Sequence, residues 1–87
     1  MTIHSGKRLS PKMVEALDVA RAHGGELVRW PGGFWTWPFC PRDSNQPLFH
    51  VPSWHTSTHT IKAIVARGLM EPTEGGQGYY RRVRIKP

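Results

Sequence analysis

The chain has 87 residues, a length typical of one small domain with a single hydrophobic core. Its residues are 38% hydrophobic and 21% charged, as in soluble globular proteins, and its apolar stretches are far shorter than the roughly 20 residues of a membrane-spanning helix, so no membrane partner is expected. Twelve lysines and arginines against six acidic residues give a formal net charge of +6, which makes nucleic acid a candidate partner.

The first predicted element is a helix from Ser10 to Gly24, preceded by a flexible polar arm, residues 1–9. Ser10 is a typical N-cap, and Pro11 falls at the first helical position, where the amide hydrogen that proline lacks is not needed. Apolar residues then recur every three or four positions. Gly24 and Gly25 end the helix, because glycine readily adopts the left-handed backbone found there.

A β-hairpin is predicted next, in the sequence ELVRWPGGFWTW. Its strands cover about residues 26–30 and 34–37, because both are rich in β-forming residues and a Pro-Gly-Gly turn separates them. The stretch that follows, residues 38–54, contains four prolines, which exclude a regular helix or a central strand. We therefore expect an irregular loop after the hairpin.

The sequence TSTHTIKAIVARGLM predicts a second helix, capped by Ser57 or Thr58 and ended at Gly68. Its apolar face consists of Ile61, Ile64, Val65 and Leu69. The remaining residues predict a second hairpin with a glycine-rich tip, because glycines recur between residues 75 and 78. In its return strand, one face carries Tyr79, Arg81, Val83 and Ile85, and the other carries Tyr80, Arg82, Arg84 and Lys86.

The segment from Thr56 to Lys86 resembles the recognition helix and wing of winged helix-turn-helix proteins. The shared features are a threonine-rich helix start, regularly spaced apolar residues, Arg-Gly-Leu, a glycine-tipped hairpin and a basic return strand. The whole chain also resembles small proteins encoded by phages and prophages. The resemblance implies one α+β, winged-helix-like domain over residues 10–87, with two main helices, an aromatic β-hairpin and a C-terminal β-wing. Residues 38–54 depart from the family, which normally has a helix before the recognition helix.

On this resemblance, the helix from Ser57 to Arg67 would enter the major groove of double-stranded DNA. The polar helix face and the basic strand supply the expected nucleic-acid contacts, which are Ser57, His59, Thr60, Lys62, Ala63, Arg67, Arg81, Arg82, Arg84 and Lys86. The expected function is a small regulator of transcription from a phage or mobile element. A homodimer would increase its specificity, although the sequence identifies no dimer surface.

The aromatic residues are concentrated in the first hairpin and the loop after it. Seven of the nine fall between Trp30 and Trp54, while the predicted helices supply only aliphatic side chains, so most rings are expected in the core. Both faces of the hairpin carry rings, so at least one of Trp30, Phe34, Trp35, Trp37 and Trp54 should stay exposed. Contact with a protein partner is assigned to Trp30, Phe34, Trp35 and Trp37. The alternative function is therefore a protein-binding winged helix, such as a phage-encoded inhibitor of a host enzyme or of a host-defence complex of the anti-CRISPR type.

No pattern in the sequence indicates a catalytic, cofactor or metal site. His55 and His59 have the spacing of two helical metal ligands, but His55 is expected to precede the helix and no paired cysteine motif accompanies it. Cys40 has no histidine at a defined spacing, and the glycine runs lack the Lys-Ser/Thr of a phosphate-binding loop. We expect a protein that is not an enzyme and uses no metal or cofactor. The single cysteine and the polar N-terminal residues favour a cytoplasmic location.

Overall fold

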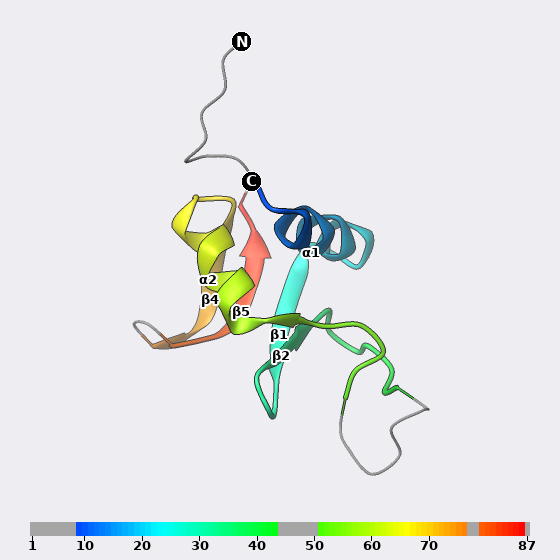
Figure 1. The fold of residues 1–87 in the computed structure, drawn as a ribbon. Coiled ribbons are helices and arrows are strands. Elements are labelled where there is room, and N and C mark those ends of the chain that lie inside the picture. The colour runs from blue at the N-terminus through cyan, green and yellow to red at the C-terminus, as the bar shows by residue number, and fades with distance from the viewer. Residues whose placement is uncertain (1–8, 44–50, 77–78, 87) are drawn as a thin grey trace.

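The computed structural model describes residues 9–43, 51–76 and 79–86 (Figure 1). These residues form a compact α+β domain with two helices and a five-stranded antiparallel sheet. In chain order the elements are α1 (Pro11–Ala22), β1 (Glu26–Trp30), β2 (Phe34–Thr36), β3 (Thr56–Ser57), α2 (Thr58–Ala66), β4 (Met70–Gly76) and β5 (Tyr79–Ile85). Neither helix of this described part has the length and apolar character needed to cross a membrane. The predicted arm, residues 1–9, lies outside the described residues except for its last position.

Helix α1 begins and ends where the sequence predicts. The Ser10 hydroxyl accepts a hydrogen bond from the Met13 amide at 3.2 Å, and the Met13 sulfur accepts one from the Ser10 amide at 3.4 Å. At the other end Gly24 and Gly25 have φ values of +94° and +84°, and the Gly25 amide donates to the Ala20 carbonyl at 2.6 Å. The glycine pair thus turns the chain from α1 directly into β1.

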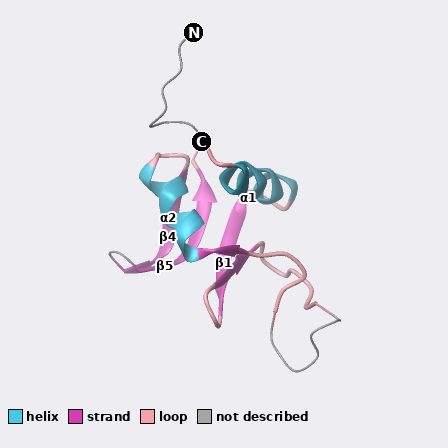
Figure 2. Cartoon of the chain, viewed as in Figure 1, coloured by secondary structure: helices cyan, strands magenta, loops and turns pink. Residues whose placement is uncertain are grey.

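Both helices pack on the same face of the sheet (Figure 2). The strand order is β3-β2-β1-β5-β4, so the first hairpin and the C-terminal hairpin join through β1 and β5. One continuous core contains side chains from α1, from α2 and from single faces of the strands, namely Met13, Ala16, Leu17, Ala20, Leu27, Trp35, Ile61, Ile64, Met70 and Val83. Because one core serves the whole domain, the positions of α2 and of both hairpins are mutually dependent.

The two hairpins diverge beyond a short common ladder. Strands β1 and β5 pair from Glu26 with Arg84 to Val28 with Arg82. From there β1 continues only with β2, and β5 continues only with β4. Figure 1 shows strands β1 and β2 running in a different direction from strands β4 and β5. The sheet is therefore forked at the end opposite to α1.

The C-terminal hairpin contains a bend that requires glycine. Its register shifts between Pro72 and Glu74 and again between Glu74 and Gly75. Gly75 has a φ of +114°, and a Cβ atom there would overlap the backbone of Tyr79 and Arg81. The bend therefore depends on Gly75.

The predictions of both helices and both hairpins are confirmed, and the structure adds one strand. The hairpin strands predicted over 26–30 and 34–37 span residues 26–30 and 34–36. Strand β3, which was not predicted, pairs with β2 and leads directly into α2. It lies between α2 and residues 38–54, the stretch in which the winged-helix resemblance implies a helix. The described parts of the proline-rich stretch, residues 38–43 and 51–54, contain no helix.

Candidate nucleic-acid interface

The start of α2 is positioned by a cap and by a buried tryptophan. The Ser57 hydroxyl accepts a hydrogen bond from the Thr60 amide at 3.2 Å, so Ser57 is the N-cap. Trp35, fully buried in β2, donates from its indole nitrogen to the Thr58 hydroxyl at 3.0 Å. The first turn of α2 is therefore attached to the middle of the first hairpin.

The exposed face of α2 is narrower than the sequence predicts. Thr60 is only 6% exposed, and its hydroxyl lies 3.1 Å from that of Ser57. Ala63 is half-buried and packs against the core. The assignment of Thr60 to the outer face is therefore wrong, and Ala63 offers little surface, because a short helix in a small domain buries a wide stripe. The other predicted contacts on or beside α2 are exposed, namely Ser57, His59, Lys62 and Arg67.

Two of the predicted phosphate contacts, Arg82 and Arg84, face away from the helices. Val83 between them is fully buried in the core beneath α1 and α2. Because side chains alternate along a strand, the two arginines lie on the opposite face of the sheet. Lys86 follows β5 and is exposed, and its amide donates to the carbonyl of Leu69 at 3.0 Å. The expectation that Arg82 and Arg84 contact nucleic acid together with the exposed face of α2 is therefore wrong, because they lie on the other side of the sheet.

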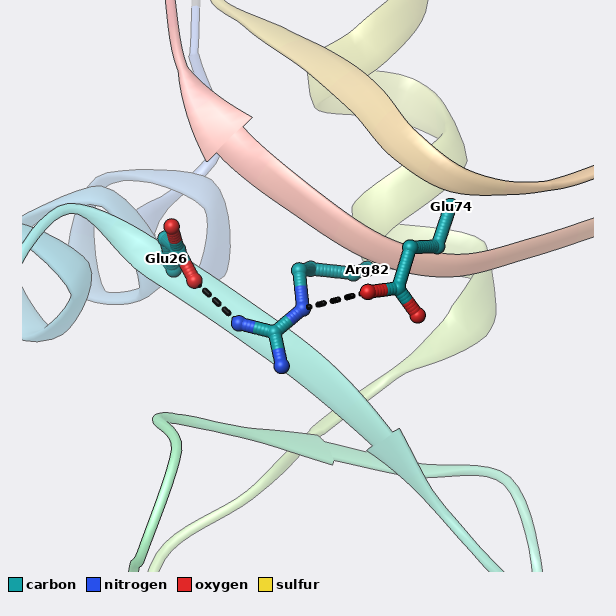
Figure 3. Close-up of polar contacts among 3 residues, drawn as sticks. All are labelled: Glu26, Glu74 and Arg82. Carbon is teal, nitrogen blue, oxygen red and sulfur yellow. Dashed lines mark hydrogen bonds and ion pairs between the residues drawn. The ribbon is translucent and has the colours of Figure 1, made fainter.

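These two arginines are also neutralised by carboxylates. The Arg82 guanidinium pairs with Glu26 and, at 3.3 Å, with Glu74 (Figure 3). The Arg84 Nε lies 2.6 Å from Oε2 of Glu71. Three acidic side chains therefore offset two arginines on this face, which leaves little positive charge for phosphate groups.

Other cations lie on the helix side of the sheet. Arg29 is opposite Trp35 in the β1–β2 ladder, so both side chains point to the same face. Arg81 shares the face of Val83 by strand alternation. Among the described residues, neither Arg29 nor Arg81 pairs with a carboxylate, and both are exposed. These two arginines keep their positive charge on the same side of the sheet as α2.

Arg29 and Arg81 flank one exposed aromatic ring, that of Tyr79. Arg29 Nη1 donates a hydrogen bond to the Tyr79 hydroxyl at 2.6 Å, and its Cζ lies 4.9 Å from the ring centroid. The Arg81 Cζ lies 5.9 Å from the same centroid. Cation–π attraction at these distances stabilises the cluster. The cluster connects the ends of the two diverging hairpins, since Arg29 belongs to β1 and Tyr79 to β5.

A groove of about 360 Å³ opens between the diverging hairpins. Arg29 and Trp30 belong to one wall, and the other wall includes Glu74, Tyr79, Arg81 and Arg82. Three arginines against one glutamate give the groove a positive charge. Sequence analysis assigned Arg81 and Arg82 to nucleic acid but missed Arg29 and Tyr79. The sequence did contain a signal for Arg29, because side chains alternate along β1 and Arg29 therefore lies on the same face as the core residue Leu27.

Among the four aromatic side chains predicted to contact a partner, Trp35 belongs to the core, Trp37 packs against the core, and Trp30 and Phe34 are half-buried. Trp35 is fully buried, so its assignment as a partner contact is wrong. Trp37 stacks on His23 with ring centroids 3.8 Å apart, and Phe34 makes an edge contact with a histidine ring at 4.6 Å. The expectation that at least one of five aromatic rings stays exposed is also wrong. All five are half-buried or buried, namely Trp30, Phe34, Trp35, Trp37 and Trp54.

In the loop after the first hairpin, the ring of Phe39 is 99% exposed. Phe39 follows Pro38 in a tight turn, closed by a 3.2 Å hydrogen bond from the Cys40 amide to the Trp37 carbonyl. Its φ of +66° is the value that the third residue of a type II turn requires and that usually selects glycine. A phenylalanine at this position combines backbone strain with a solvent-exposed ring.

The Cys40 thiol lies in the loop next to this turn. Burial would raise the pKa of Cys40, but hydrogen bonding, chiefly with the Ser53 side chain at 3.4 Å, favours the thiolate and lowers the pKa. In the part of the chain that the structure describes, no three side chains among His, Cys, Asp and Glu gather as a metal site would require. None of the residues that hydrogen-bond to the Cys40 thiol is a histidine, which could act as a base and activate the thiol as a nucleophile.

No family model, curated protein or solved structure matches this chain. The candidate interface is the helix-side surface, which we define as His59 and Lys62 on α2 together with Arg29, Tyr79 and Arg81 on the sheet. All five side chains are exposed. The surface combines a polar helix face, one aromatic ring and two arginines that pair with no carboxylate among the residues that the structure describes.

Proposed function

We propose that this protein binds double-stranded DNA through the helix-side surface, as a small winged-helix-like regulator from a phage or mobile element. The observation that carries the proposal is the charge distribution across the sheet. Arg29 and Arg81 are exposed on the side of α2 and pair with no carboxylate in the described part of the chain, whereas Arg82 and Arg84 on the opposite face are paired. Positive charge is thus available beside the helix.

The order and pairing of the elements support the winged-helix part of the proposal. Helix α2 leads into the β4–β5 hairpin, and β5 pairs back with β1, which follows α1. A helix followed by a basic hairpin is the arrangement that the resemblance implies. In this chain β2 and β3 take the role of the missing helix, because the hydrogen bond from Trp35 to Thr58 supports the first turn of α2.

Each part of the surface has a distinct role in the proposed complex. The start of α2, capped by Ser57, carries free backbone N–H groups and the positive end of the helix dipole, which favour a phosphate. His59 faces the bases of the major groove, and Lys62, with Arg67 at the end of α2, contacts the phosphates along it. Arg29 and Arg81 bind phosphates of the flanking backbone, for which the guanidinium geometry is well suited.

The salt dependence of duplex binding tests the proposal. With Arg29, Lys62, Arg67 and Arg81 at phosphates, log K should fall with log[salt] at a slope of about −4. The measurement is fluorescence anisotropy of a labelled random duplex of about 20 base pairs over a salt series. Lys62→Ala should weaken binding, whereas Arg84→Ala, which removes an exposed cation of the opposite face, should not. Absence of binding by micromolar protein at low salt would rule the proposal out.

A second candidate function is docking on a partner protein, such as a host enzyme or host-defence complex. It is favoured by Phe39, whose exposed ring has the character of an interface anchor. The test is capture of a partner from the native host with wild-type protein and with Phe39→Ala. A partner that the wild type captures and the variant does not, at unchanged duplex affinity, would support this candidate. Equal capture by both proteins would argue against a role for Phe39.

A further inference from the structure

The groove between the hairpins has the size of a small-ligand site. Its volume of about 360 Å³ lies near the lower end of the range of roughly 300–1,000 Å³ that such sites occupy. A DNA double helix is too large to enter a groove of this volume, because the major groove of DNA alone is about 12 Å wide. A duplex bound to the helix-side surface would therefore pass over the groove, and only a group released from base pairing could enter it.

The walls of the groove offer an aromatic surface that is fixed in position. Tyr79 is 50% exposed, and the hydrogen bond from Arg29 at 2.6 Å restrains its ring. This bond spans the region in which β1 and β5 no longer pair with each other. Nucleobases stack on aromatic side chains with little regard to sequence, because every base has a π-face. A restrained, half-exposed tyrosine is suited to that contact.

The charges around the ring suit a phosphate. The guanidinium carbons of Arg29 and Arg81 lie over the Tyr79 ring, 4.9 Å and 5.9 Å from its centroid, so a base that stacks on this ring takes the place of a guanidinium group there, and the displaced cation stays within reach of the phosphate. Glu74, the carboxylate among the described lining residues, pairs with Arg82 at 3.3 Å. Its negative charge is therefore largely compensated, and a phosphate near the two free arginines meets a net attraction.

We propose that this groove binds one unpaired nucleotide, with its base stacked on Tyr79 and its phosphate at Arg29 and Arg81. The inference rests on the proposed DNA-binding function and specifies which DNA is preferred. A duplex with a single unpaired nucleotide offers both parts of the ligand, since its paired region contacts α2 while its free base enters the groove. The chain then discriminates between damaged, bulged or junction DNA and a fully paired duplex.

The experiment compares three duplexes of the same sequence, which are fully paired, with one bulged thymidine, or with one bulged abasic site. Wild-type protein should bind the bulged thymidine roughly tenfold more tightly than the paired duplex, and the abasic site should abolish most of this preference. Tyr79→Ala should remove the preference, so that this variant binds the bulged and the paired duplex with equal affinity. Tyr79→Phe, which keeps the ring, should retain most of it. Arg84→Ala, on the opposite face of the same strand, is the matched control and should behave as wild type.

A second measurement reports stacking directly. A 2-aminopurine at the bulged position should lose fluorescence when wild-type protein binds, and should keep it when Tyr79→Ala binds. Equal affinity of the wild type for paired and bulged duplexes would overturn the inference and leave the proposed function intact. A bulge preference that persists in Tyr79→Ala would also overturn it, because the base would then bind elsewhere. Failure to bind any of the three duplexes would overturn the inference together with the proposed function.

Discussion

The indole nitrogen of Trp35 donates a hydrogen bond to the Thr58 hydroxyl across 3.0 Å, and this contact joins β2 to the first turn of α2. Trp35 is fully buried, so the bond forms at the edge of the hydrophobic core. On the neighbouring strand, Arg29 lies opposite Trp35 and points to the same face. Trp35 therefore supports the start of the helix from the same face of the sheet that carries Arg29.

Replacing Trp35 with phenylalanine should destabilise the domain and loosen the start of α2. The smaller ring leaves a cavity and removes the donor to Thr58, which together should lower the free energy of unfolding by about 1–3 kcal/mol. Chemical denaturation measures this loss, and hydrogen exchange should show faster exchange of the first amides of α2. Trp54→Phe, at a half-buried position, is the control and should lose less. Equal stability of Trp35→Phe and wild type would contradict the role assigned to Trp35.

Replacing Phe39 with glycine should stabilise the protein. Phe39 has a left-handed φ of +66°, which glycine adopts without strain, so the free energy of unfolding should rise by about 1 kcal/mol. Phe39→Ala separates the two effects, because it removes the exposed ring and retains the Cβ atom. Thermal or chemical denaturation of the three proteins gives the comparison. If alanine stabilises as much as glycine, exposure of the ring and not backbone strain is the cause.

The stability of the protein should increase with pH across the titration of Cys40. The pKa of the folded thiol is lowered, since hydrogen bonding outweighs the burial that would raise it, so the folded state releases this proton at a lower pH than the unfolded chain does. The stabilising contribution is therefore complete above the pKa of the unfolded chain and disappears as the pH falls through the folded pKa. Denaturation of wild type and Cys40→Ala between about pH 7 and pH 10 should show a difference that grows with pH. A difference that shrinks with pH would mean that burial dominates.

The secondary structure could be predicted where local chemistry determines it. The N-caps Ser10 and Ser57 and the glycine pair after α1 act within one turn of the chain, and each has its predicted effect. Strand β3 was not predictable in this way. It is only two residues long and exists because β2 offers a free edge, which is a non-local condition.

The candidate site was less predictable, because its charges are decided by distant residues. The alternation of side chains along β5 correctly placed Arg81 and Arg82 on opposite faces of the sheet. However, the carboxylate that pairs with Arg82 belongs to Glu26, which is 56 positions away in the chain. Strand pairing brings them together, and single-sequence reasoning could not identify that register. Similarly, the partner of Arg29 is Tyr79, 50 positions away. Local patterns therefore identified the cations but not which of them are free.

Phe39 shows a different limit of sequence analysis. The turn at Pro38 could be expected, because proline favours the second position of a type II turn. The third position of that turn usually selects glycine, and a phenylalanine there gives no turn signal. Its exposure also contradicts the reasonable expectation that large rings in a small domain are buried. Residues that violate such rules often have functional roles.

The most direct test of the proposed interface compares the salt dependence of duplex binding in two double variants. Arg29→Ala/Arg81→Ala removes the unpaired arginines beside α2, and Arg82→Ala/Arg84→Ala removes the paired arginines on the opposite face. Both variants lose two positive charges, so a general effect of net charge is the same in each. We predict that the first variant reduces the magnitude of the log–log slope by about two units and that the second leaves it unchanged. An unchanged slope in the first variant, or a reduced slope in the second, would contradict binding through the helix-side surface.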